Sequence, residues 1–137
     1  MSSETNETRE TVGTFFRLLA EGDADRVGDI FAERIDWFVP GDEKLPWTGH
    51  RSQRHEVAEY FKTMWPIFVP GASEVVMDKV IVEGPDAVAL GRFTHTVAAN
   101  GRRFSTAVAF HLTVDDGRIV RLHLYEDTFA AAAAVNG

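Results

Sequence analysis

The sequence predicts an α+β domain in which helices cover one face of a curved antiparallel sheet. In residues 8–68 the apolar side chains recur three and four positions apart, which is the spacing of one helix face. In residues 74–127 they alternate or form β-branched runs instead, in four segments separated by Gly-containing turns. Helices followed by a run of antiparallel strands are typical of the α+β class.

Three helices and one short strand are expected in the first half of the chain. The first helix begins near Thr8, the second follows its N-cap residue Asp23, and the third follows Ser52. Pro66 must end or kink the third helix, because proline has no amide hydrogen and clashes with the preceding turn. Residues 34–39, RIDWFV, are rich in β-branched and aromatic side chains and predict a strand.

The second half of the chain predicts four strands, at 74–83, 87–98, 103–114 and 118–127. Asn100-Gly101 between the second and third of them is a strong signal for a two-residue hairpin turn. Such a turn pairs Val97 with Phe104, His95 with Thr106, and Phe93 with Val108. Paired residues share a face of the sheet, so His95 and Phe93 are expected on the apolar face toward the helices, as is Phe110.

The last strand divides in the same way into an inward and an outward set. Alternation places Val120, Leu122 and Leu124 on the inward side, with Glu126 as the next inward position. The outward set, with His111 of the neighbouring strand, is Arg121, His123 and Tyr125. We expect this polar outer face to form the interface of a homodimer.

Composition limits the classes of function that remain. The chain of 137 residues is expected to be one domain, 1–137, with a frayed lead at 1–6 and a tail at 130–137 that is a helical cap or disordered. A net charge of −7 argues against a nucleic-acid partner, because that affinity depends on Lys and Arg at phosphates. There are no cysteines, and the five His lack the spacing of helical metal pairs, so no metal and no cofactor are expected.

Targeting signals are not evident in the sequence. The first ten residues, MSSETNETRE, are polar, unlike a signal peptide. No run of about 18 apolar residues is present, so no membrane span is expected. We therefore expect a soluble, cytoplasmic protein with no membrane partner.

His95 and Glu126 are the two candidate catalytic residues. A His on an apolar face suits acid–base chemistry, because its pKa lies near working pH and burial moves it. A carboxylate beside Leu124 and aromatic rings would have its pKa raised by desolvation, which suits proton transfer. The alternatives are a hydrogen-bonded core or interface His95 and a rim salt bridge of Glu126.

Aromatic and apolar side chains around these two residues are the candidate ligand-binding set, because ligand sites are largely apolar with few polar groups. The stretch DWFVPGDEKLPWTGHR places two Trp beside turn residues, so Trp37 is expected as a cavity wall and Trp47 as a lid. The full predicted set is Phe15, Trp37, Val39, Trp47, Tyr60, Trp65, Phe93 and Phe110. The alternative for these residues is ordinary core packing.

Three stretches carry a resemblance to a known superfamily: LLAEGDADRVGDIFAERIDWFVPG, LPWTGHRSQRHEVAEYF and DDGRIVRLHLYEDTF. They resemble the SnoaL-like and ketosteroid-isomerase-like superfamily, whose cone-shaped α+β fold also occurs in nuclear transport factor two. The resemblance covers nearly the whole chain and implies a curved sheet wrapped around three N-terminal helices. This fold hosts isomerases, cyclases, dehydratases, epoxide hydrolases and non-catalytic binders, so the resemblance implies no single chemistry.

The catalytic residues of two related enzyme groups are not kept. Where ketosteroid isomerases have a tyrosine, a proton-shuttling aspartate and an oxyanion aspartate, the resemblance places Phe15, Val39 and Phe110 (or Ala109). None of these can do that chemistry, so the protein is not expected to be a ketosteroid isomerase.

Limonene-epoxide-hydrolase-like relatives use an Asp–Arg–Asp set to activate water. The resemblance matches its arginine to Arg92 but places Thr94 and Leu124 where two aspartates would stand, so this set is not kept either. Two hypotheses remain. One is a cofactor-free isomerase, cyclase or hydrolase-like enzyme on a small hydrophobic compound, and the other is a non-catalytic ligand-binding or dimerisation module.

Overall fold

The computed structural model describes residues 3–42 and 44–136. Its elements are, in chain order, α1 (Ser3–Glu21), α2 (Ala24–Asp29), β1 (Phe31–Val39), β2 (Gly49–Gln53), α3 (His55–Met64), the 3-10 helix η1 (Trp65–Ile67), β3 (Glu74–Glu83), β4 (Asp86–Thr96), β5 (Arg103–Asp115), β6 (Arg118–Glu126) and α4 (Thr128–Asn136).

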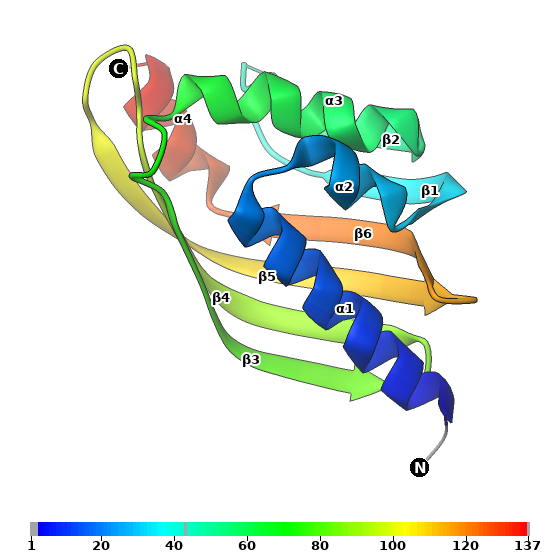
Figure 1. The fold of residues 1–137 in the computed structure, drawn as a ribbon. Helices are drawn as coiled ribbons and strands as arrows, with labels where there is room; N and C mark the ends of the chain where they lie inside the picture. The colour runs from blue at the N-terminus through cyan, green and yellow to red at the C-terminus, as the bar shows by residue number, and fades with distance from the viewer. Residues whose placement is uncertain (1–2, 43, 137) are drawn as a thin grey trace.

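The strands form one six-stranded sheet in the order β2-β1-β6-β5-β4-β3. All neighbours are antiparallel except β1 and β6, which are parallel. Figure 1 shows α1, α2 and α3 on one face of the sheet, which curls toward them at the β4–β5 turn. This confirms the predicted α+β fold with a curved sheet, and adds β2, which the sequence did not suggest.

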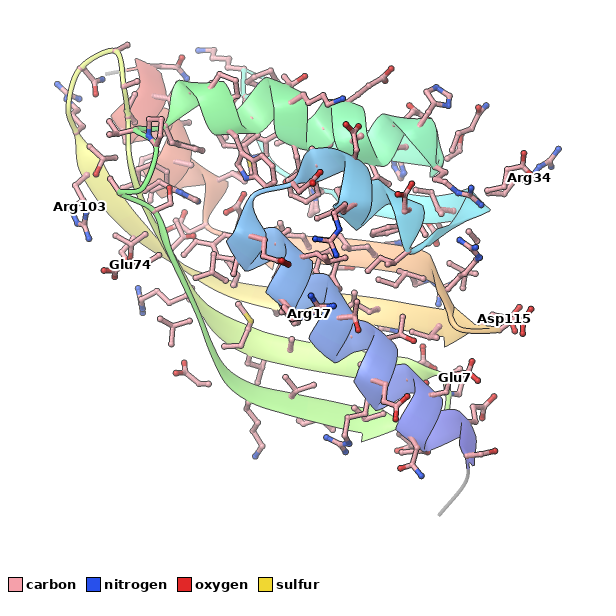
Figure 2. The ribbon with its side chains drawn as sticks, in the orientation of Figure 1. Glu7, Arg17, Arg34, Glu74, Arg103 and Asp115 are labelled. Carbon is pink, nitrogen blue, oxygen red and sulfur yellow. The ribbon has the colours of Figure 1, made fainter. Side chains whose placement is uncertain are left out.

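The first helix begins earlier than expected, at Ser3, so residues 3–6 of the expected frayed lead are helical. Residues 1–2 lie outside the described residues. The early turns are held by the β3–β4 turn, because the Gly84 amide donates to Thr5 Oγ1 at 3.1 Å. The Thr8 hydroxyl in turn donates to the Gly84 carbonyl at 2.7 Å. Arg17 of this helix points away from the sheet (Figure 2), whereas the Glu7 carboxylate accepts the amide hydrogen of Gly117 in the β5–β6 turn at 2.6 Å.

The third helix begins at His55 rather than after Ser52, because residues 49–53 are used by β2. The Glu56 carboxylate accepts the amide hydrogens of Ser52 and Gln53, each at 3.1 Å, and so holds the start of the helix. The helix ends at Met64 and continues as η1, which contains Pro66, as predicted.

The β4–β5 hairpin has a longer turn than the predicted one. His95 lies opposite Phe104 and Phe93 opposite Thr106, a shift of two residues along β5 from the expected pairs. A shift of two preserves the face of every side chain, because faces alternate with a period of two. His95, Phe93 and Phe110 are accordingly buried on the helix side, as expected.

The predicted inward set of β6 is wrong at one position. The β5–β6 register shifts between Thr113 and Val114, which leaves Ile119, not Val120, opposite Val114. Ile119 is buried and Val120 is half-buried. The irregularity at the turn end of the hairpin is a bulge, which changes side-chain parity locally.

The predicted tail forms a helix, α4, up to Asn136. It packs at the curled end of the sheet (Figure 1), where Ala131 and Ala134 are buried. The Asn100 side-chain amide donates to the Ala134 carbonyl at 2.8 Å, and the Asp42 amide donates to Thr128 Oγ1 at 3.3 Å. The helical alternative for this segment is therefore the observed one.

Candidate functional site

A cavity of about 710 Å³ lies between the helices and the concave face of the sheet. Seven of the predicted site residues line it, namely Phe15, Trp37, Tyr60, Trp65, Phe93, His95 and Phe110. The remaining three, Val39, Trp47 and Glu126, are not among the lining residues. The aromatic wall predicted from helical and strand spacing is therefore present, although the lid is not.

His95 is the central polar group of the cavity wall. It is 7% exposed, and the Phe68 ring stacks on the imidazole at a centroid distance of 4.2 Å and an angle of 12°. The rings of Phe93 and Phe104 flank it at 5.8 and 5.7 Å. Burial among these rings lowers the pKa of His95 from 6.5 to about 4, so the imidazole is neutral at pH 7.

The two imidazole nitrogens of His95 have different surroundings. Nδ1 lies 2.7 Å from the hydroxyl oxygen of Ser73, which fixes the orientation of the ring. Nε2 makes no hydrogen bond to any described residue, so it can exchange a proton or a hydrogen bond with a ligand. A neutral imidazole in an apolar cavity, held through one nitrogen and free at the other, is suited to acid–base chemistry.

Glu126 lies on the predicted face but does not join His95. Its carboxylate accepts a hydrogen bond from the Trp47 indole at 3.2 Å and a longer one from Thr106 Oγ1 at 3.5 Å. Burial raises the pKa of Glu126, and these two donors partly offset the effect. The structure records no contact between Glu126 and His95, so their joint action in proton transfer stays a prediction.

The expected lid, Trp47, is instead a core residue with an exposure of 2%. Its ring lies 5.7 Å from that of Phe68, and its indole hydrogen is taken by Glu126. Val39 is likewise fully buried in the core. Because Glu126 accepts the indole hydrogen of Trp47, the loop after β1 can fold inward and bury this ring without an unpaired donor.

Tyr60 supplies a second polar group to the cavity. Burial raises its pKa well above the ordinary value, so the phenol stays protonated. No hydrogen bond joins its hydroxyl to any residue in 3–42 or 44–136, which leaves both the donor and the acceptor available. Its ring is held by Trp37 at a centroid distance of 4.7 Å and by the Arg51 guanidinium at 5.0 Å.

Ser73 and Phe68 are site residues that the sequence reasoning did not select. Phe68 directly follows η1, and its ring stacks on the imidazole of His95. Ser73 directly precedes β3, whose first pair is Glu74 with Thr94, and its hydroxyl reaches Nδ1 of His95. Only the β3–β4 register, which shifts between Met77 and Lys79, could have revealed this neighbour.

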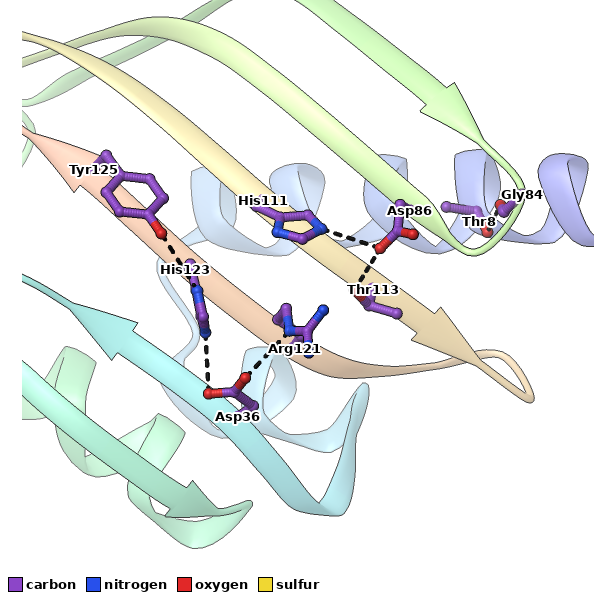
Figure 3. Close-up of polar contacts among 9 residues, drawn as sticks. All are labelled: Thr8, Asp36, Gly84, Asp86, His111, Thr113, Arg121, His123 and Tyr125. Carbon is purple, nitrogen blue, oxygen red and sulfur yellow. Dashed lines mark hydrogen bonds and ion pairs between the residues drawn. The ribbon is translucent and has the colours of Figure 1, made fainter.

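The outer face of the sheet carries a separate polar network (Figure 3). Asp86 accepts hydrogen bonds from Thr113 at 2.7 Å and pairs with His111 at 3.0 Å. Asp36 pairs in the same way with two residues of β6. These are His123 at 3.0 Å and Arg121 at 3.2 Å.

The hydrogen bonds of this outer network lower the pKa of both carboxyl groups. For Asp36 the largest cause is the bond from His123, and for Asp86 it is the bond from Thr113. Tyr125, the fourth predicted outward residue, is exposed beside His123. All four predicted outward residues therefore share this face, and the homodimer expected from them stays a prediction.

Within 3–42 and 44–136, no group of three His, Asp or Glu side chains comes together as a metal ion requires. In the same part of the chain, no helix has the length and apolar character needed to cross a membrane.

Comparison with solved structures identifies the fold. An NTF2-like protein from Burkholderia pseudomallei has a TM-score of 0.86 at 20% identity, over 100% of both chains. TerC, co-crystallized with polyporic acid, has a TM-score of 0.83 at 16% identity, over 96% of this chain and 99% of its own. A protein from a Jannaschia species, named as a SnoaL-like polyketide cyclase, has a TM-score of 0.81 at 18% identity, over 100% of this chain and 96% of its own.

Sequence comparison identifies the family. No curated protein gives a significant match to the sequence. The family model of the SnoaL-like domain, however, matches residues 12–122 and so extends over most of the chain. Taken with the cone-shaped α+β fold and its internal cavity, this match means that the protein belongs to the SnoaL-like domain family.

Proposed function

We propose that this protein binds an uncharged, hydrophobic small molecule in its cavity and that His95 removes and returns a proton on that molecule. The reaction class is a cofactor-free isomerisation or cyclisation. The observation that carries the proposal is a neutral imidazole, free at Nε2, in the wall of an apolar cavity. Nδ1 is held by Ser73, so the reacting nitrogen has a fixed direction.

The size and charge of the cavity support this class of ligand. A volume of about 710 Å³ is within the usual range of small-molecule sites, which is roughly 300–1,000 Å³. Lys62 is the only Lys, Arg, Asp or Glu among the lining residues of the described chain, and it is exposed and paired with Asp25 at 2.8 Å. A ligand carboxylate would lose its hydration without gaining a buried counter-charge, so uncharged compounds are favoured.

The family and the fold agree with a small-molecule role. SnoaL-like relatives include a protein named as a polyketide cyclase, and TerC has been crystallized with polyporic acid. In this chain the Tyr60 hydroxyl would donate a hydrogen bond to a ligand oxygen, as a neutral donor that stabilises developing negative charge.

Binding is tested by calorimetry with 2-naphthol and 2-naphthoate, two bicyclic probes that differ in charge. We expect saturable binding of 2-naphthol and at least about tenfold weaker binding of 2-naphthoate. Ala20 lines the cavity and is exposed, so Ala20→Trp should block the entrance and abolish binding. Ala133→Trp is the matched control, because Ala133 is an exposed helical residue outside the cavity. Equal binding by both Trp variants would refute the cavity as the site.

Proton transfer is tested by exchange of the acidic C–H groups of 2-tetralone, a neutral bicyclic ketone, in D2O. We expect the protein to accelerate deuterium incorporation, and His95→Gln to lose about a hundredfold or more of that acceleration while it still binds 2-naphthol. NMR of the ketone measures the rate.

A non-catalytic ligand binder is the second candidate. The engagement of Glu126 by Trp47 and Thr106 favours it, because no second proton-handling carboxylate is free in the cavity. Binding of 2-naphthol without any exchange of 2-tetralone above the buffer rate would support this alternative.

We also propose that the outer sheet face pairs with the same face of a second copy. The polar residues of the face, His111, Arg121, His123 and Tyr125, adjoin exposed apolar residues on β3 and β4, namely Val76, Ile81, Val88 and Leu90. A two-fold interface of this kind buries apolar area at its centre under a polar rim. Light scattering should report a dimer for the protein and a monomer for Val88→Asp, and a monomeric unmodified protein would refute the proposal.

A further inference from the structure

Ser73 connects the buried His95 to the solvent. The hydroxyl of Ser73 lies 2.7 Å from His95 Nδ1, and this is the only hydrogen bond of the imidazole within the described chain. Ser73 itself is exposed, whereas His95 is 7% exposed. Ser73 also lines the cavity, so it is an exposed residue of the cavity wall that contacts the imidazole.

The other approaches to the imidazole are apolar. Phe68 covers one face of the ring at 4.2 Å, and Phe93 and Phe104 lie beside it. His95 lines the cavity, and its Nε2 has no hydrogen bond within the described residues, so a bound hydrophobic ligand would displace water from this side of the ring. With the ligand in place, the Ser73 side is the route by which the imidazole reaches water.

Ser73 lies directly before the first residue of β3. That strand begins at Glu74, which pairs with Thr94, the neighbour of His95 on β4. Just beyond, Arg103 on β5 lies 4.0 Å from Glu74 and donates to the Ala72 carbonyl at 3.5 Å. Figure 2 shows Glu74 and Arg103 together at this end of the molecule.

We propose that Ser73 is a proton relay through which Nδ1 of His95 exchanges protons with water while a ligand occupies the cavity. The inference rests on the proposed acid–base function of His95. Ser73 acts through His95 and is a positioning and relay residue rather than a catalytic one.

The relay allows proton transfer without a buried cation. When a ligand C–H or O–H bond breaks, its electron pair stays on the ligand and its proton bonds to Nε2. The Nδ1 proton passes to the Ser73 oxygen, and the hydroxyl proton of Ser73 leaves to water, so the imidazole stays neutral in its other tautomer. The reverse sequence returns a proton from Nε2 to a different ligand atom. An imidazolium among three Phe rings would be strongly disfavoured, consistent with the low pKa of His95.

The test is the rate of solvent exchange of the His95 ring N–H, measured by NMR on the ¹⁵N-labelled protein. The His95 signal is assigned by its absence in His95→Gln. With 2-naphthol bound, Ser73→Ala should slow the exchange by more than about tenfold compared with the unmodified protein, and Ser73→Thr, which keeps the hydroxyl, should restore it. Ser105→Ala is the matched control, because Ser105 is exposed on the outer face and bonds Thr94 rather than His95.

Unchanged exchange in Ser73→Ala, or exchange that Ser73→Thr fails to restore, would overturn the relay. The measurement is made on the free protein and again with 2-naphthol, so it does not depend on turnover. If Ser73→Ala leaves the ring exchange unchanged while the protein binds 2-naphthol and exchanges 2-tetralone, the relay is refuted and the proposed function stands. If Ser73→Ala slows the ring exchange but the protein neither binds 2-naphthol nor exchanges 2-tetralone, the proposed function is refuted and the Ser73–His95 exchange path stands.

Discussion

The stability of the protein should depend on pH through His95. The pKa of this group is about 4 in the folded protein and 6.5 when unperturbed, because burial among Phe rings disfavours the imidazolium. The folded state therefore binds the proton less well than the unfolded state. The stability is fully present above pH 6.5 and is lost as the pH falls through 6.5 toward about 4.

The size of this effect follows from the two pKa values. At about 1.4 kcal/mol for each pH unit, the interval between 6.5 and about 4 corresponds to about 3.4 kcal/mol, of which about 2.5 kcal/mol is lost by pH 4.5. The groups around the imidazole are Ser73 and the rings of Phe68, Phe93 and Phe104, none of which carries a charge that would offset it.

The assay is denaturant unfolding of the unmodified protein and His95→Gln at pH 7.5 and pH 4.5. The difference in free energy of unfolding between the two proteins should shift by about 2.5 kcal/mol in favour of His95→Gln at the lower pH. Other titrating groups cancel in this difference. His55→Gln is the control, because His55 is exposed, and it should show no such shift. A pH-independent difference for His95→Gln would refute the reasoning.

Four further substitutions test the packing and the buried hydrogen bond of Glu126. Gly91→Ala should destabilise the protein by about 1–3 kcal/mol or more in thermal unfolding, because the added methyl would overlap the Val76 carbonyl. Gly13→Ala should instead stabilise it by about 0.5–1 kcal/mol, because the added methyl on α1 meets open space. Equal effects of the two changes would contradict this. Trp47→Phe should cost about 1–3 kcal/mol, because Glu126 loses a hydrogen-bond donor. The cost should be larger at pH 7 than at pH 4, because the bond lowers the pKa of Glu126 and so favours its ionised form. A pH-independent cost in denaturant unfolding would count against the bond. Glu126→Gln should gain stability relative to the unmodified protein as the pH rises above about 4.5, because burial raises the pKa of Glu126 in the folded state. A relative gain in stability on acidification would contradict a raised pKa.

The fold and one face of the site were predictable because they depend on periodicity. His95 was placed correctly on the concave face even though the β4–β5 register was wrong by two residues, since an even shift does not change the face. The Val120 prediction was wrong because the bulge near Val114 changes parity, and no residue in the turn signals it.

Depth and partners were not predictable in the same way. Alternation shows which face a side chain is on, but Trp47 lies in a loop, where no periodicity applies. Its burial depends on Glu126, which is 79 residues away in the sequence. Ser73 was missed for a similar reason, because its contact with His95 depends on how β3 pairs with β4. β3 is a long edge strand with a register shift, and its pairing could not be derived from the sequence.

The place of β1 in the sheet has a consequence for how the chain folds. β1 lies between β2 and β6, and its parallel partner β6 begins only at Arg118. Most of the chain must therefore be synthesised before β1 meets β6, and closing so long a loop slows folding. Until then β1 has only β2 beside it in the sheet, and a nascent chain that stalls before β6 would expose the aromatic side chains of β1 as an aggregation-prone surface.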